Sequence, residues 1–416
     1  MRVFKFGGAS VKDANGVKNL AKVLSKTGHK GTLIIVSAMG KTTNALETVV
    51  KNYFENKDEL QSSIQDIKKF HNQILLDLFE NERHFVFNTV KLLFEELSGF
   101  LKTNKSPDYN FVYDQTIGYG ELVSTTIISH YLNEIGLKNT WLDVREYIKT
   151  DNYYRRANVE WDLTQKNITS NFDTSQLNIT QGFLGSDANN FTTSLGREGS
   201  DYTAAIFAFC LNATSVTIWK DVPGVLNADP RYFENAKLLN QISYREAIEL
   251  AFYGASVIHP KTLQPLQRKE IPLFVKSFLN PENAGTCVSK GKTLDPEIPC
   301  FIVKKNQILI SLSSLDFSYI VEENISDIFN LLHLYKMKVD VIQNSAISFS
   351  VCIDNIYNNL EKLLQHLKAK FKVHCHENVS LYTIRHFTPK AINELEVGKT
   401  VLLKQLTQET VQIVTK

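Results

Sequence analysis

The feature that most constrains the fold is a continuous apolar run, Thr32–Ser37 (TLIIVS), in which apolar and polar side chains do not alternate. Such a run is typical of a strand that is buried on both faces of a sheet. Stretches with helical spacing lie on either side of it, at Val11–Leu24 and Asn44–Phe54. Strands that alternate with helices predict an α/β fold of three layers, with a mostly parallel sheet between two layers of helices.

The alternation continues to about residue 280. Further strands are predicted at Arg2–Phe4, Asn139–Leu142, Asn178–Leu184, Val216–Trp219 and Leu273–Lys276. Further helical stretches are predicted at Glu59–Leu101, Leu122–Leu132 and Tyr244–Phe252. Ligands of such sheets bind beyond the carboxyl ends of the strands, so we expect functional residues in the loops that follow them.

The composition changes after Ala284–Thr286, and Asp295–Pro299 (DPEIP) has the residues of a linker. The elements that follow have the order β-α-β-β-α-β of a ferredoxin-like α+β unit. They are Phe301–Ser311, Ile325–Tyr335, Val339–Asn344, Ser348–Ile353, Leu360–Lys370 and Lys372–Cys375. The tail adds a possible hairpin of Val401–Leu406 and Glu409–Val414 and is too short for a second complete unit.

Composition excludes several classes of function. A formal net charge of +2, without basic clusters interleaved with aromatic residues, argues against a nucleic-acid partner. The five cysteines form no C-x-x-C pair, and His374 and His376 have no further ligand near them, so we predict no protein metal site and a reducing compartment. Because no apolar run has the length of a membrane span and a strand begins at residue 2, we expect a cytoplasmic protein without a signal peptide.

Two glycine-bearing stretches carry the strongest chemical signal, Lys5–Ser10 (KFGGAS) and Gly196–Asp201 (GREGSD). The first follows a strand, where backbone N–H groups can approach a phosphate while the Lys5 ammonium neutralises it. The second places an arginine and an aspartate before the apolar helical run Tyr202–Leu211, and a helix N-terminus attracts anions. Together they predict a site for a nucleotide phosphate and an anionic small substrate, although a Gly-Gly turn alone is common.

Other segments leave two interpretations open. Gly40–Thr43 (GKTT) resembles the end of a Walker A loop, but Ile35 stands where that loop needs its first glycine, so a true P-loop is not expected. Ser37, Thr42 and Thr43 then offer hydroxyls to a ligand, or a threonine simply caps a helix.

Charged residues near turns are equally ambiguous. Glu121 fits a solvated first-turn charge better than an ammonium ligand when this segment is taken alone. Asp221 and Arg231 follow a strand in a turn-rich loop and fit either turn capping or contacts with a nucleotide. His259 fits a structural hydrogen-bonding role better than a catalytic one.

Taken together, these segments resemble aspartate kinase (aspartokinase) of the amino-acid kinase superfamily. KFGGAS stands where that family has KFGGTS, and GYGELVST resembles its S-x-G-E-x-x-S segment. ITQGFLG, LGREGSDYTAA, IWKDVPGVLNADPR and ELAFYGASVIHPKTLQP follow in the family's order. The resemblance implies an amino-acid kinase catalytic domain over residues 1–294. Residues 300–416 resemble the family's ACT-type regulatory region, with one full unit and an abbreviated second one.

The resemblance implies Mg²⁺- and ATP-dependent phosphorylation of the β-carboxylate of L-aspartate to 4-phospho-L-aspartate, the first step toward lysine, threonine and methionine. It implies catalytic roles for Lys5 and Asp201. The implied substrate-binding residues are Thr43, Glu121, Arg197, Gly199 and Ser200. The implied nucleotide-binding residues are Lys5, Phe6, Gly7, Gly8, Ser37, Lys220, Asp221, Leu226, Arg231, Ser256 and Val257. The nucleophile would be a carboxylate with an ordinary pKa of about 3.9, so no general base is needed.

The sequence departs from the family's pattern at four positions in these segments. Glu198 replaces the second glycine of G-R-G-G-S-D, which we expect to be tolerated with a negative φ. Lys220, Leu226 and Ser256 stand where the family has threonine, tyrosine and lysine. One lysine is thus lost and one gained, which motivates the hypothesis that Lys220 replaces the missing nucleotide-binding cation.

The regulatory region is less typical of the family. Val321–Ile325 lacks the glycine of the effector-binding turn, and Ala346 replaces an acidic residue, although Asp340 and Ser345 remain. We therefore predict weak or absent feedback by lysine. Two alternatives stay open, namely another amino-acid kinase and a catalytically silent amino-acid-sensing subunit. We expect a homodimer through the C-terminal region, because ferredoxin-like units with exposed sheet edges often pair.

Overall fold

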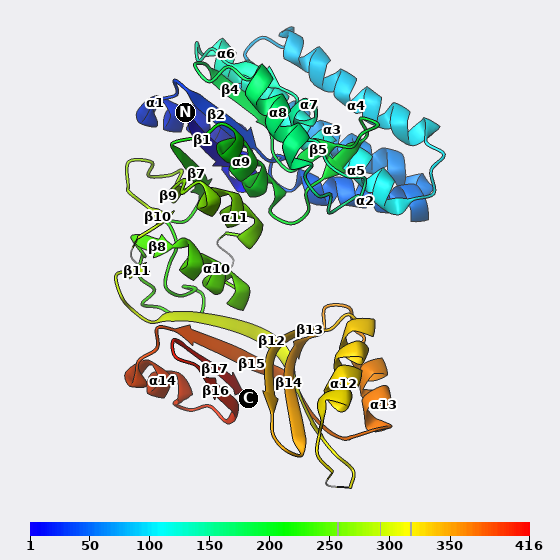
Figure 1. The fold of residues 1–416 in the computed structure, drawn as a ribbon. Coiled ribbons are helices and arrows are strands. Elements are labelled where there is room, and N and C mark those ends of the chain that lie inside the picture. The colour runs from blue at the N-terminus through cyan, green and yellow to red at the C-terminus, as the bar shows by residue number, and fades with distance from the viewer. Residues whose placement is uncertain (256–257, 292, 317) are drawn as a thin grey trace. The chain divides into compact units, whose positions relative to one another are not determined.

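The structure is a computed structural model that describes residues 1–255, 258–291, 293–316 and 318–416, and the chain divides into two compact units. The first unit contains residues 1–225, 238–248 and the described part of 257–295. Its nine-stranded sheet has the order β11-β8-β10-β9-β7-β1-β2-β4-β3 (Figure 1). The strands are β1 (Arg2–Phe6), β2 (Thr32–Val36), β3 (Thr140–Leu142), β4 (Leu177–Gln181), β7 (Ser215–Lys220), β8 (Gln241–Ser243), β9 (Leu273–Ser277), β10 (Thr286–Ser289) and β11 (Leu294–Asp295).

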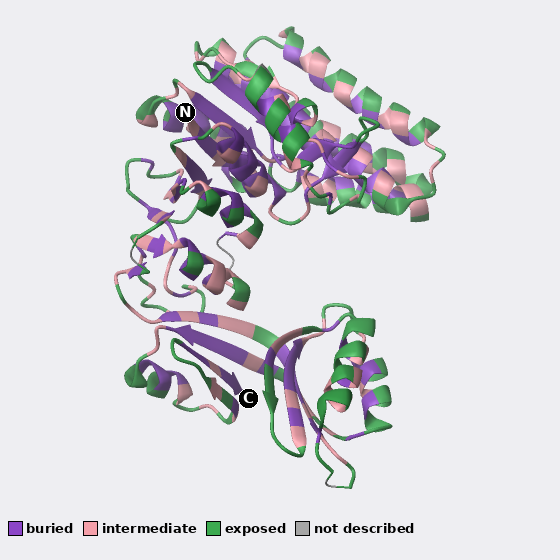
Figure 2. Cartoon of the chain, in the orientation of Figure 1, coloured by how far each residue is buried: buried purple, intermediate pink, exposed green. Residues whose placement is uncertain are grey.

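The centre of this sheet is parallel and largely buried. β1 lies between β2 and β7, with Lys5 opposite Ile35 on one side and Ile218 on the other. All five residues of β2 are buried, which confirms the strand predicted from the unbroken apolar run (Figure 2). A separate small hairpin joins β5 (Leu184–Ser186) to β6 (Thr192–Ser194).

Helices cover both faces of the sheet. Phe4, Phe6 and Ile34 belong to a core that includes residues of α1, α3, α4 and α6. Successive residues of a strand point to opposite faces, so Val3 and Lys5 point to the other face, where α9 contacts β1, β2 and β7 and also packs on α8 and α11. The helices are α1 (Ala14–Thr27), α2 (Thr42–Glu55), α3 (Lys57–Leu78), α4 (Phe85–Thr103), α5 (Tyr109–Ile117), α6 (Tyr119–Glu134), α7 (Val144–Tyr147), α8 (Trp161–Asn171), α9 (Gly199–Cys210), α10 (Tyr244–Tyr253) and α11 (Pro260–Arg268), with a 3₁₀ turn η1 (Gly8–Val11).

Several predicted boundaries are corrected. The stretch Glu59–Leu101 forms two helices, α3 and α4, instead of one continuous segment. β1 extends to Phe6, so Lys5 lies within the strand and not just beyond it. The predicted strand Asn178–Leu184 ends at Gln181, because Gly182 lies so close to α9 that an added Cβ would be 2.4 Å from the Cβ of Ser200.

The second unit contains residues 226–237, the described part of 249–256 and residues 296–416. Its six-stranded antiparallel sheet has the order β13-β14-β12-β15-β17-β16. The elements are β12 (Cys300–Ser313), α12 (Glu322–Leu334), β13 (Lys338–Asn344), β14 (Ser348–Asp354), α13 (Leu360–Lys368), β15 (Lys372–Arg385), α14 (Pro389–Glu396), β16 (Val401–Leu406) and β17 (Thr410–Thr415).

The first four strands of this sheet have the ferredoxin-like order, so the predicted fold class is confirmed for both parts of the chain. β15 is much longer than the predicted Lys372–Cys375, and its second half pairs with β17. The predicted hairpin therefore exists as β16 and β17 and extends the same sheet. Within the described part of the chain, no helix combines the length and the apolar character needed to cross a membrane.

Candidate active site

A buried ion pair marks the carboxyl end of β1. The Nζ atom of Lys5 lies 2.7 Å from Oδ1 of Asp201, and the two side chains are only 13% and 4% exposed. Asp201 belongs to the first turn of α9, the helix that packs on this face of the sheet. Burying an ammonium without a partner is costly, so Asp201 holds Lys5 in place beside the N-terminus of α9.

The loops after β1 and β2 touch at their glycines. A Cβ added to Gly8 would lie 2.7 Å from the carbonyl oxygen of Ala38 and 3.0 Å from that of Gly40. The N–H of Gly40 donates to the carbonyl of Gly8 at 3.1 Å, and a Cβ on Gly7 would lie 3.3 Å from Nζ of Lys5. Glycine at position 8 is therefore required by the close approach of the two loops.

Glu121 is buried near this junction, so its interpretation as a solvated charge is wrong. The residue lies in the first turn of α6 and is 3% exposed. Its Oε1 accepts a hydrogen bond from the N–H of Ala38 at 3.2 Å, whereas Oε2 is buried with no hydrogen-bond partner among the described residues. Burial raises the pKa of Glu121 to about 8, and the Ala38 N–H and the Lys5 charge oppose that rise. The site thus contains a carboxylate oxygen with a free position for a cation.

Hydroxyl groups tie the surrounding elements together. Ser37, which follows β2, donates to Oγ of Ser200 in α9 at 3.0 Å. Ser124, one helical turn after Glu121, donates to the carbonyl of Ser37 at 2.8 Å. Thr43 is half-buried in the first turn of α2. The N-cap of α2 is Lys41, so the suggested capping by a threonine is wrong.

The turn before α9 contains Arg197 and Glu198. Arg197 is exposed, and Glu198 has φ 54°, so the expected negative φ is wrong. The carbonyl of Glu198 accepts from the N–H groups of Asp201 (3.0 Å) and Tyr202 (3.1 Å), which begin the helix. The left-handed conformation therefore costs about 1–2 kcal/mol but orients a carbonyl that closes the first turn of α9. Gly199 and Ser200 follow within that buried turn.

The residues predicted on the nucleotide side lie in several places. The side chain of Phe6 is buried and stacks on Trp219 with ring centroids 6.0 Å apart, so only its backbone is open to a ligand. Lys220 ends β7 half-buried, and Asp221 follows it exposed. The remaining four predicted positions lie elsewhere: Leu226 and Arg231 belong to the second compact unit, and Ser256 and Val257 lie outside the described residues.

Arg231 and His259 each make a local contact within their own segment. Arg231 is exposed and forms an ion pair with Asp229, with Nη2 2.6 Å from Oδ2. His259 caps α11, since its Nδ1 accepts from the N–H of Lys261 at 3.2 Å, which confirms its predicted structural role.

Sequence reasoning missed Ala38, Ser124 and Asp114. Ser124 had a readable signal, because it lies three residues after Glu121 and so on the same helix face. Ala38 acts through its backbone and leaves no signal in the sequence. Asp114 in α5 is fully buried and accepts from Oγ of Ser194 at 2.6 Å and from the N–H of Arg155 at 2.9 Å. Burial raises the pKa of Asp114 to about 6 against these hydrogen bonds.

Comparison with known proteins adds independent information. A model of the amino acid kinase family matches residues 1–277. The lysine-sensitive aspartokinase 3 of Escherichia coli (strain K12) is 31% identical over 92% of this chain and 86% of its own length. The chloroplastic aspartokinase 1 of Arabidopsis thaliana is 31% identical over 85% of this chain and 63% of its own length.

Solved structures resemble the whole chain as well. A structure of Escherichia coli aspartokinase III in complex with lysine and aspartate (T-state) has a TM-score of 0.85 at 28% identity and covers 100% of this chain and 95% of that one. The same enzyme in complex with aspartate and ADP (R-state) has a TM-score of 0.81 at 28% identity, with 100% and 96% of the two chains covered. The likeness therefore includes both compact units.

Proposed function

We propose that this chain, which belongs to the amino acid kinase family and within it to the aspartokinases, transfers the γ-phosphoryl group of ATP to the β-carboxylate of L-aspartate. The observation that carries the proposal is the buried carboxyl group of Glu121, which has an unpartnered Oε2 and no ion pair with any described residue and lies within electrostatic reach of the Lys5–Asp201 ion pair. The carboxyl group of Glu121 lacks a cation, whereas Lys5 presents one. A zwitterionic amino acid beside a phosphate satisfies both requirements.

The substrate groups can be assigned to side chains by charge. The ammonium of aspartate binds Glu121, whose second oxygen has no hydrogen-bond partner among the described residues. The α-carboxylate pairs with Arg197, because a guanidinium fits a planar carboxylate in a bidentate manner. Thr43 in the first turn of α2 and the N–H group of Ser200 at the N-terminus of α9 provide further hydrogen bonds, whereas the N–H of Gly199 already donates to the carbonyl of Gly196 at 3.0 Å.

The chemical step needs no proton transfer. An oxygen of the β-carboxylate, already ionised at neutral pH, forms a bond to the γ-phosphorus while the bond from that phosphorus to the β,γ-bridging oxygen breaks and ADP leaves. The barrier comes mainly from bringing two anions together. Lys5 lowers it by neutralising the transferring phosphoryl group, and Asp201 fixes the position of that ammonium.

The residues present fit a magnesium ion that enters with the nucleotide. Among the described residues, no group of three or more histidine, cysteine, aspartate and glutamate side chains could hold a metal. Mg²⁺ usually keeps several waters and binds one or two carboxylates together with phosphates, and Asp201 supplies a carboxylate at the right place. When bound, the ion would neutralise phosphate charge.

We assign residues 1–294 to catalysis and residues 300–416 to regulation, and we infer a homodimer through the latter. β13 is an edge strand of the six-stranded sheet, and on and beside it Ile342 and Ile347 are 41% and 40% exposed. An exposed edge with apolar side chains favours pairing with a second copy. The turn before α12 has no glycine, and the side-chain oxygen of Asn324 accepts from the N–H of Val321 at 3.0 Å. Weak lysine feedback therefore stays our prediction.

The test is to trap the acyl phosphate. Purified protein, ATP, Mg²⁺ and hydroxylamine are incubated together with one acid at a time. The three acids are L-aspartate, L-glutamate and N-acetylglutamate. We expect an iron-chelating hydroxamate with aspartate only. A product with another acid would assign a different amino-acid kinase. The absence of a product with every acid, together with intact aspartate binding, would favour the silent sensing subunit.

A further inference from the structure

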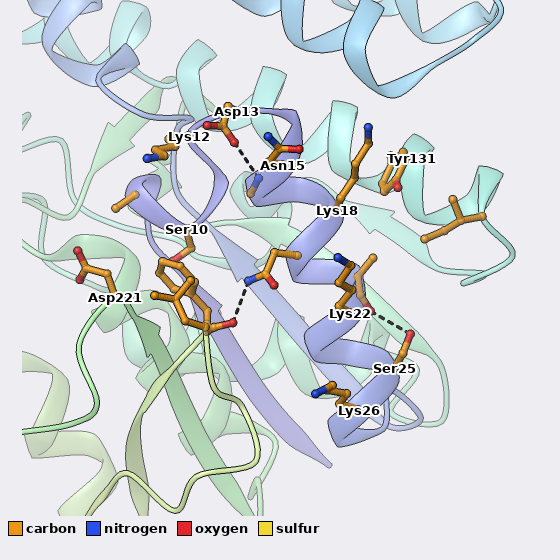
Figure 3. Close-up of a pocket in the computed structure, with 17 residues that line it drawn as sticks. Ser10, Lys12, Asp13, Asn15, Lys18, Lys22, Ser25, Lys26, Tyr131 and Asp221 are labelled. Carbon is orange, nitrogen blue, oxygen red and sulfur yellow. Dashed lines mark hydrogen bonds between the residues drawn. The ribbon is translucent and has the colours of Figure 1, made fainter.

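A large pocket adjoins the candidate site along α1. It has a volume of about 1090 Å³ and is lined by the loop after β1, one face of α1 and the segment after β9 (Figure 3). Ser10 and Asp221 are among its lining residues. Ser10 lies two residues after Gly8 and donates to the carbonyl of Trp219 at 3.3 Å. The pocket therefore begins where the predicted phosphate loop ends.

Four lysines line this pocket, and they differ in their partners. Lys18 donates to the carbonyl of Asp77 at 3.1 Å, and Lys26 lies 3.5 Å from Oε2 of Glu282. Lys12 and Lys22 are exposed and have no hydrogen bond or ion pair with the described residues. Positive charge is thus available in the pocket, and part of it is uncompensated.

Of these two lysines, Lys12 is nearer in the chain to the Gly7-Gly8 loop. It follows η1, two residues after Ser10. Its backbone lies against the loop after β2, since a Cβ added to Gly40 would lie 3.5 Å from the carbonyl oxygen of Lys12 and 3.7 Å from its Cα. Figure 3 shows Lys12 and Asp221 at the end of the pocket near Ser10, with Lys22 and Lys26 further along α1. The side chain is consequently an exposed ammonium that follows the phosphate loop and lies close to the loop after β2.

The candidate site needs such a group. A nucleotide tail carries several negative charges, and Lys5, held by Asp201 at 2.7 Å, supplies only one positive charge to them. We propose that the Lys12 ammonium binds a phosphate of the nucleotide, as a second cation beside Lys5. This inference rests on the nucleotide use in the proposed function. Asp221, at the same end of the pocket, suits a donor such as a ribose hydroxyl, so the phosphates lie toward Lys12.

The test measures ADP binding by calorimetry in the full-length chain, in its wild-type form and as Lys12→Met. We expect about tenfold weaker ADP binding in the variant, because a charge-assisted hydrogen bond is lost. Adenosine, which has no phosphate, should bind both proteins equally. Lys12→Arg should retain ADP affinity, and the matched control Lys22→Met, from the same pocket, should bind ADP like the wild type. The KM for aspartate should not change in Lys12→Met.

Equal ADP affinity in Lys12→Met and the wild type would overturn the proposal. Equal losses in Lys12→Met and Lys22→Met would also overturn it, because they would indicate only the general field of the pocket. Far-ultraviolet circular dichroism and the melting temperature of each variant show that it is folded. A wild-type protein that binds ADP but forms no aspartyl phosphate would refute the proposed reaction alone, and the ADP affinities would still decide the role of Lys12.

Discussion

Two buried carboxyl groups, one in each compact unit, differ in whether the chain itself provides a cation for them. In the second unit the side chain of Asp340 is 7% exposed and has Nζ of Lys304 at 2.8 Å and Nζ of Lys338 at 3.6 Å. In the first unit Glu121 is 3% exposed and forms no ion pair with any described residue. Each has one oxygen without a hydrogen-bond partner among the described residues.

The difference shows what identifies a binding site. An unpartnered buried oxygen occurs in both units, so it does not distinguish structure from function. The missing cation does, because the chain neutralises Asp340 itself and leaves Glu121 to be neutralised by a proton or by a ligand. The carboxyl group of Glu121 in the first unit therefore needs a cation from the substrate, whereas that of Asp340 in the second unit already has one from the chain.

Removing the central cation of the first unit should have the largest effect. For Lys5→Met we expect kcat to fall by about a thousandfold or more, because the lysine neutralises the transferring phosphoryl group. The rate of hydroxamate formation measures the loss, and aspartate binding by calorimetry serves as the control for an intact site. A fall of less than tenfold would contradict the role assigned to Lys5.

The matching change in the second unit should affect stability instead. Lys304→Met leaves Asp340 with only the more distant Lys338, so we expect the second unit to lose about 2–3 kcal/mol of unfolding free energy. Denaturant unfolding followed by circular dichroism measures this, and kcat at saturating substrates should stay within twofold of the wild type. Adding Asp340→Leu should restore most of the stability. An unchanged free energy of unfolding in Lys304→Met would show that the Lys304–Asp340 ion pair does not stabilise this unit.

The smallest effect is expected at the strained turn of the first unit. Glu198→Gly should raise the unfolding free energy by about 0.5–1 kcal/mol, because glycine adopts the positive φ of 54° at little cost and the entropy that it adds to the unfolded chain offsets only part of this gain. The measurement is denaturant unfolding, with Glu198→Ala as the control, which removes the side chain and keeps the strain. A gain as large in the alanine variant would attribute the effect to the side chain and not to φ.

Short-range patterns in the sequence were sufficient for much of the fold. The apolar run of β2 and the helical spacing of α1 and α2 are local, and so is the hairpin of β16 and β17. The break between α3 and α4 and the length of β15 were not predictable in this way, because pairing and packing with distant residues decide them.

The features of the candidate site also divide into those that the sequence predicted and those that only the structure shows. Lys5, Glu121 and Asp201 were named from their motifs, but the burial of Glu121 was not foreseen. It depends on Ala38 and Gly120, since a Cβ on Gly120 would lie 3.0 Å from the Cβ of Ala38. The positive φ of Glu198 was also missed, because the first turn of α9 imposes it through the Glu198 carbonyl. Contacts between loops far apart in sequence carry this information.

The most direct test of the central claim is proton release on aspartate binding. Because the pKa of Glu121 is raised to about 8 by burial, the carboxyl is mostly protonated at pH 7 and should ionise when an ammonium arrives. Titration calorimetry with L-aspartate in the presence of ADP, repeated in PIPES and in Tris at pH 7, measures the protons released. Aspartate affinity should also rise from pH 6 to pH 8 as ionisation becomes easier.

We predict release of close to one proton by the wild type, and none by Glu121→Gln, which should bind aspartate about tenfold more weakly. Binding of aspartate without proton release by the wild type, or with the same release by Glu121→Gln, would contradict the claim that Glu121 receives the substrate ammonium.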